Sequence, residues 1–154
     1  MKLSKAVFLF FLFYVLTLIQ TSFLIHYSWR GTGINLVLLV FIIFLFNHKK
    51  DIKEGVLLAV MAGFFLDIFS SYFFGLFILF FIILFFLISQ IRKRILANNL
   101  WGYLLVLFSI IIIYYFFFFL ISRSFNFFDV IYNFLVGIVI YFILKIFYAF
   151  KQGF

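Results

Sequence analysis

The chain has 154 residues, of which 69% are hydrophobic and only 10% charged, and its mean hydropathy is +1.38. One soluble core of this length cannot hide so much apolar surface, so the composition predicts an integral membrane protein. In such a protein the formal net charge of +8 indicates orientation rather than nucleic-acid binding. The 31 Phe lie in long apolar runs without interleaved basic residues, which favours lipid contact and no nucleic-acid partner.

Residues that could support catalysis or metal binding are scarce. The chain has no Cys, and His26 and His48 are far apart, which excludes a disulfide framework, a thiol nucleophile and a zinc site. Asp67 and Asp129 are both expected toward the outer side, but each occupies a turn where Asp commonly caps the following helix. We therefore predict a non-enzymatic protein with no catalytic, cofactor-binding or metal-binding residues.

Six helices are predicted by dividing the apolar runs by length. The first run is too long for a signal-peptide core and lacks an Ala-x-Ala-like exit, so we expect a membrane helix. The second is short, so we expect it to start near Trp29, with Arg30 reaching the interface. The run 55–91 would be about 55 Å long as one helix, against a hydrocarbon core of about 30 Å, and must fold back near Asp67, Ser70, Ser71 and Tyr72. The last run breaks similarly near Arg123, Ser124 and Asn126. The predicted spans are 6–25, 30–46, 55–69, 73–91, 100–121 and 128–146.

Basic residues test this division independently of hydropathy. With the N-terminus inside, ten Lys and Arg fall on the cytoplasmic side and two fall outside, as the positive-inside rule requires. The prediction is thus a single integral membrane domain over 1–154, all-α and polytopic, with both termini in the cytoplasm. The cytoplasmic set is Lys2, Lys5, Lys49, Lys50, Lys53, Arg92, Lys93, Arg94, Lys145 and Lys151, and the outer set is Arg30 and Arg123.

The third span carries a small residue or an acid at every fourth position. Such positions form one ridge on a helix, and small residues there let a second helix approach closely in lipid. The ridge drifts by about 40° per step, so three or four members at most face one neighbour. Packing inside the bundle and contact with an external subunit both remain open. The candidates for helix or partner contact are Ala59, Gly63, Asp67, Ser71 and Gly75, in a ridge beginning at Gly55, together with Asn35 of the second span.

Asp67 is the only acidic residue between Glu54 and Asp129. Three roles are open for it: a local cap at the outer boundary, contact with a partner helix, or a place in an ion or substrate path. A cap would accept backbone N–H bonds, and Asn is then expected to replace much of its role. The other polar residues within spans are expected to join helices rather than to bind ligands. These are Thr17, Gln20, Asn35, Ser109 and the pair Asn133 and Gly137.

The segment 63–75 resembles the signature of the rod shape-determining protein MreD family, which reads roughly Gly-x-x-x-Asp-hydrophobic-hydrophobic-x-Gly-x-x-x-Gly. Ser71 stands where Gly is usual in that family. Chain length, Asn35 near the start of the second span and the short basic loop 92–94 are also similar, although the Pro that often precedes this Asn is missing, as is every other Pro. The matching signature positions are Gly63, Asp67 and Gly75.

The resemblance implies a non-enzymatic inner-membrane scaffold of the complex that builds the lateral cell wall in elongating bacteria. MreD-like proteins bind MreC, a single-span protein, and work beside MreB, RodA and a penicillin-binding transpeptidase. The implied fold is similar to the substrate-binding subunits of energy-coupling-factor transporters, so the alternative is a six-helix subunit that binds a vitamin or an ion. A vitamin site needs converging polar and aromatic groups, whereas the outer loops here are short, which favours the scaffold.

Overall fold

The computed structural model describes residues 3–24, 33–47, 52–95, 100–122 and 126–152. These residues form six α-helices and one π-helical segment, and the described ranges contain no β-strand. The described part of the chain is therefore all-helical, as predicted. The elements are α1 (Leu3–Leu18), η1 (Ile19–Phe23), α2 (Leu36–Asn47), α3 (Ile52–Phe69), α4 (Leu76–Ile95), α5 (Leu100–Ser122) and α6 (Phe127–Gln152).

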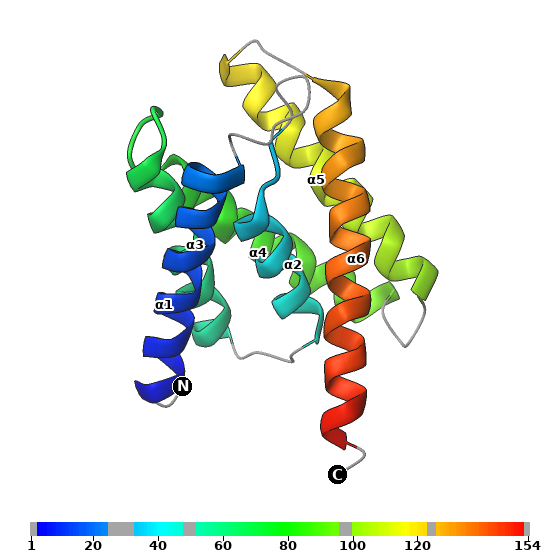
Figure 1. The fold of residues 1–154 in the computed structure, drawn as a ribbon. Helices are drawn as coiled ribbons and strands as arrows, with labels where there is room; N and C mark the ends of the chain where they lie inside the picture. The colour runs from blue at the N-terminus through cyan, green and yellow to red at the C-terminus, as the bar shows by residue number, and fades with distance from the viewer. Residues whose placement is uncertain (1–2, 25–32, 48–51, 96–99, 123–125, 153–154) are drawn as a thin grey trace.

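The helices run back and forth between two ends of the molecule. Figure 1 shows that α1 begins and α6 finishes at the same end, while the turn between α3 and α4 lies at the opposite end. One described helix segment, Gly102–Ile121, is long and apolar enough to cross a membrane by length and composition. The shorter apolar helices are Ala6–Ser22, Leu36–Phe46, Leu76–Ile91 and Phe127–Ile143.

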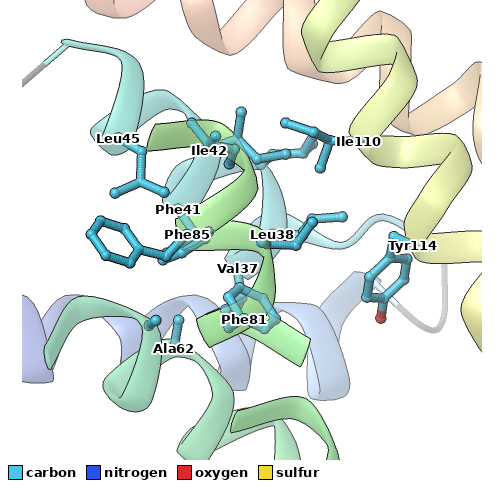
Figure 2. Packing of buried hydrophobic residues seen from close by; sticks show 14 of the residues in the cluster. Val37, Leu38, Phe41, Ile42, Leu45, Ala62, Phe81, Phe85, Ile110 and Tyr114 are labelled. Carbon is cyan, nitrogen blue, oxygen red and sulfur yellow. The ribbon is translucent and has the colours of Figure 1, made fainter. Parts of the chain in front are cut away.

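Helix α2 lies at the centre of the fold. Its sequence is apolar on every side, which is typical of a helix surrounded by other helices. It packs against α1, α3, α4 and α6. Figure 2 shows its side chains among those of α3, α4 and α5, and the Phe41 and Phe81 rings meet edge to face with centroids 4.8 Å apart. The buried residues of α2 are Val37, Leu38, Leu39, Phe41, Ile42, Ile43 and Leu45.

The predicted start of the second helix is wrong. Residues 33–35 are not helical, and α2 begins only at Leu36. One cause is local: the Asn35 side chain accepts a hydrogen bond from the Leu38 N–H at 3.0 Å and so acts as the N-cap. Trp29 and Arg30 lie outside the described residues. The α-helical part of the first segment also stops earlier than predicted, at Leu18, and η1 continues it to Phe23.

Both predicted reversals have counterparts in the structure. Residues 70–75 are not helical and join α3 to α4, although α4 begins at Leu76 rather than at 73. Helix α5 ends at Ser122 and α6 begins at Phe127, while 123–125 lie outside the described residues.

Among the basic residues used to predict orientation, only Lys53 has a described side chain, and it is exposed.

Candidate functional site

Asp67, near the end of α3, binds the start of α4 with both carboxylate oxygens. Oδ1 accepts a hydrogen bond from the Phe77 N–H at 2.9 Å, and Oδ2 accepts one from the Ile78 N–H at 3.2 Å. These are the second and third residues of α4, whose N–H groups an N-cap side chain normally serves. The residue before α4 is Gly75, which has no side chain. Asp67 therefore caps a helix other than its own, and its negative charge suits the positive end of α4.

With this cap, the N–H groups in the first turn of α4 need no hydrogen bonds from water. The Leu76 N–H donates to the Phe73 carbonyl at 3.2 Å, so the first three N–H groups of α4 all have protein partners. Ser70 Oγ donates to the Asp67 carbonyl at 3.3 Å and so serves the end of α3. Asp67 itself is only 4% exposed. The carboxylate thus works inside the protein, where no solvent competes for the two N–H groups.

Gly63 lets the two helices of this hairpin touch backbone to backbone. A Cβ placed on Gly63 would collide with the Ile78 Cα and would lie 2.6 Å from the Ile78 nitrogen. A Cβ on Gly55 would collide with the Phe85 ring, and Ala59, between the two glycines, is fully buried. The ridge from Gly55 to Asp67 therefore packs α3 within the chain, and α4 is the neighbour that its glycines meet.

Ser71 and Gly75 do not continue this ridge as predicted, and their contact with a partner stays a prediction. Helix α3 ends at Phe69, which places both residues in the turn. Ser71 is exposed. Gly75 has φ of 98°, a left-handed conformation that residues with a Cβ rarely adopt, and a Cβ there would meet nothing within 4 Å. Gly75 thus allows the backbone to turn, and no close packing requires a glycine there.

A second polar cluster, which we name the α2 clamp, holds the segment before α2 against α5 and α6. Asn133 of α6 is fully buried; its Oδ1 accepts from the Asn35 N–H at 2.7 Å and its Nδ2 donates to the Gly33 carbonyl at 2.8 Å. Asp129 Oδ1 accepts from the Gly33 N–H at 3.0 Å. Tyr115 of α5 donates its hydroxyl to the Gly33 carbonyl at 3.3 Å and accepts from Asn133 Nδ2 at 2.7 Å. The clamp consists of Gly33, Asn35, Tyr115, Asp129 and Asn133.

Asp67 and Asp129, the two acidic residues expected toward the outer side, bond to different parts of the chain. Asp67 serves the start of α4, and Asp129 serves Gly33 before α2. Within the described residues no group of three or more His, Cys, Asp or Glu residues could hold a metal ion. The geometry of both carboxylates is that of hydrogen-bond acceptors for backbone N–H groups.

Some polar residues join helices as expected, and others do not. Gln20 Oε1 accepts from the Val37 N–H at 3.4 Å, which links η1 to α2. Gly137 of α6 is buried, and a Cβ there would lie 3.1 Å from side-chain atoms of Leu107 and of Leu39. The hydroxyls of Thr17 and Ser109 do not join helices as expected. Their hydroxyls donate to carbonyls four residues earlier in their own helices, as is common for Ser and Thr.

Tyr115 and Gly33 are the members of the clamp that sequence reasoning missed. Tyr115 stands at the start of a run of Phe residues and follows another Tyr, so nothing in its local sequence marks it as a polar contact. Gly33 contributes only backbone atoms, which no residue pattern reveals. Comparison of the chain with protein-family models, with curated proteins and with solved structures found no match.

Proposed function

We propose that this chain is a non-enzymatic, six-span scaffold of the bacterial inner membrane that binds an MreC-like single-span partner. In this role it would work with MreB, RodA and a penicillin-binding transpeptidase in lateral wall synthesis and so maintain rod shape. The sequence resemblance of segment 63–75 supplies the family. The structural support is that two of its signature residues, Gly63 and Asp67, join α3 to α4.

That use of the signature is the observation that carries the proposal. A scaffold needs a surface of fixed shape, and a hairpin closed by a buried carboxylate and a backbone contact provides one. A transporter needs polar groups that face a bound ligand. Here the polar atoms of Asp67 and Asn133 bond to backbone groups of the protein itself. This favours the scaffold over the vitamin-binding or ion-binding subunit.

The proposed membrane topology has six spans with both termini in the cytoplasm. It is supported by the ten-to-two distribution of basic residues and by the alternation of helix ends in Figure 1. Large apolar side chains on α5 also face outward, including Leu105, Phe116 and Leu120, which are 66%, 56% and 63% exposed. In water such a surface would aggregate, whereas in a bilayer it contacts lipid.

Reporter fusions test the topology directly. Fusions after Lys50, Ser71, Lys93 and Ser124 should read cytoplasmic, outside, cytoplasmic and outside. A cytoplasmic result at Ser71 would contradict the α3–α4 hairpin as a membrane reversal.

Co-purification from native membranes tests the function. The tagged chain, extracted in mild detergent after cross-linking, should recover an MreC-like protein and wall-synthesis enzymes. Recovery of an ATPase module in their place would support the transporter subunit and contradict the scaffold. A tagged membrane protein of similar size and unrelated function, expressed at the same level, controls for non-specific recovery.

A further inference from the structure

The turn between α3 and α4 exposes large apolar side chains and carries no charge. We call residues 68–75 the hairpin tip. Phe73 is 84% exposed and Phe74 is 67% exposed, while Ile68 and Phe69 are 50% and 43% exposed. The nearest charged group is the Asp67 carboxylate, which turns inward to α4. A turn that meets water usually exposes polar side chains, and this one exposes mainly aromatic ones.

Each helix of the hairpin is also too short to cross a bilayer. The open end of the hairpin is marked by charged residues, Lys53 and Glu54 on α3 and Arg92 on α4. Beyond them α3 continues for 15 residues (55–69), and the apolar part of α4 has 16 (76–91). At 1.5 Å per residue these lengths are about 22 and 24 Å. The hydrocarbon core measures about 30 Å, so with the charged end at the inner surface both helices end about 6 to 8 Å inside the outer boundary, and the turn 70–75 fills this distance. Any tilt of the hairpin increases this distance.

We infer that the hairpin tip lies at the outer edge of the hydrocarbon, where Phe73 and Phe74 contact lipid acyl chains and the start of α4 lies inside the outer leaflet. The hydrogen bonding of the backbone at the start of α4 is suited to a hydrocarbon environment. In hydrocarbon an unsatisfied N–H group is costly, and the N–H groups of Leu76, Phe77 and Ile78 all have protein partners. The buried Asp67 supplies two of these partners without exposing its charge to lipid. The inference rests on the proposed membrane location, and it adds the depth at which the turn between α3 and α4 lies.

Tryptophan fluorescence at the tip measures its depth. The native Trp29 and Trp101 are first replaced by Phe, and the full-length chain is reconstituted in phosphatidylcholine vesicles. Phe73→Trp then reports the tip. Ile83→Trp, at a 47% exposed position on α4, is the deep reference, and Ile52→Trp, at a 68% exposed position at the charged end of α3, is the shallow reference.

If the tip lies in hydrocarbon, Phe73→Trp loses most of its fluorescence to lipids brominated on the acyl chains. Its emission should be blue-shifted like that of Ile83→Trp, and aqueous acrylamide should quench it far less than it quenches Ile52→Trp. Phe74→Trp should behave in the same way and provides the measurement if Phe73→Trp does not reconstitute. Quenching of both tip probes by acrylamide to the level of Ile52→Trp, with Ile83→Trp still quenched by brominated lipid, would overturn the inference alone. Failure of brominated lipid to quench Ile83→Trp would overturn the membrane location as well.

Discussion

Replacing Asp67 by Leu removes both acceptors that serve the start of α4. A hydrogen bond to a charged group contributes about 1.5 to 3 kcal/mol, so the loss of two predicts a fall of about 3 to 6 kcal/mol in the free energy of unfolding. Removal of an ordinary N-cap costs only about 0.5 to 2 kcal/mol, because water takes over the freed N–H groups. The higher range applies here, since Asp67 is only 4% exposed and solvent cannot replace it.

Asp67→Asn separates hydrogen bonding from charge. The amide offers one acceptor oxygen, whereas the Phe77 and Ile78 N–H groups each use a separate carboxylate oxygen. One N–H group would therefore face the amide NH₂, and the interaction of the carboxylate charge with the positive end of α4 would be lost. Because each N–H group uses its own carboxylate oxygen, we expect Asn to replace only part of the role. The predicted order of stability is wild type, then Asn, then Leu, with Asn near the middle.

The free energy of unfolding can be measured by titrating SDS into mild-detergent micelles and following helicity by circular dichroism. Ser71→Ala, at an exposed position in the same turn, is the control and should stay close to wild type. A Leu variant as stable as this control would refute the capping role. Equal and large losses for Asn and Leu in partner recovery at matched membrane abundance, without equal losses in stability, would instead indicate an ion or proton path that needs the titratable charge.

The remaining predictions concern Gly63, Gly75 and the α2 clamp, and all are measured by the same unfolding titration. Gly63→Leu should destabilise by at least about 1 to 3 kcal/mol, because even a Cβ would collide with the Ile78 backbone; wild-type stability would contradict this contact. Gly75→Ala should cost about 1 kcal/mol through its positive φ alone, and no change would show that the turn adopts another conformation. Asn133→Leu should cost about 1 to 3 kcal/mol, since it leaves the buried Asn35 N–H without its acceptor, and wild-type stability would argue against that bond.

Much of the helical layout could be predicted from the sequence because it follows from length and hydropathy. A 37-residue apolar run cannot lie straight in one bilayer, so a reversal had to fall at its few polar residues, and residues 70–75 do form a turn. The spacing of Gly55, Ala59, Gly63 and Asp67 also indicated a close helix contact. The spacing could not indicate which helix makes the contact. It also included two positions too many, Ser71 and Gly75, because the four-residue pattern continues in the sequence after the helix has ended at Phe69.

The start of α2 could not be predicted fully, because distant residues act together with the local Asn35 cap to fix it. Hydropathy and length alone favoured an earlier start near Trp29. The chain before Leu36 instead bonds to Asn133 and Asp129, which lie about a hundred residues later on α6. Both residues were noted in the sequence, but no local pattern pairs an amide on one helix with the backbone before another. The missing information is therefore tertiary.

In both the hairpin and the α2 clamp, side chains of one helix accept hydrogen bonds from the N–H groups at or before the start of another. A helix start leaves N–H groups without partners, and hydrocarbon offers them no water. Helix α4 receives the two oxygens of Asp67 from α3, and the N–H groups before α2 receive Asn133 and Asp129 from α6. Each bond that satisfies a helix start also ties two helices together, so the few polar side chains in these helices serve backbone chemistry and tertiary structure at once. A fold held in this way keeps a fixed shape, which is the property that the proposed membrane scaffold requires of the surface that meets its partner.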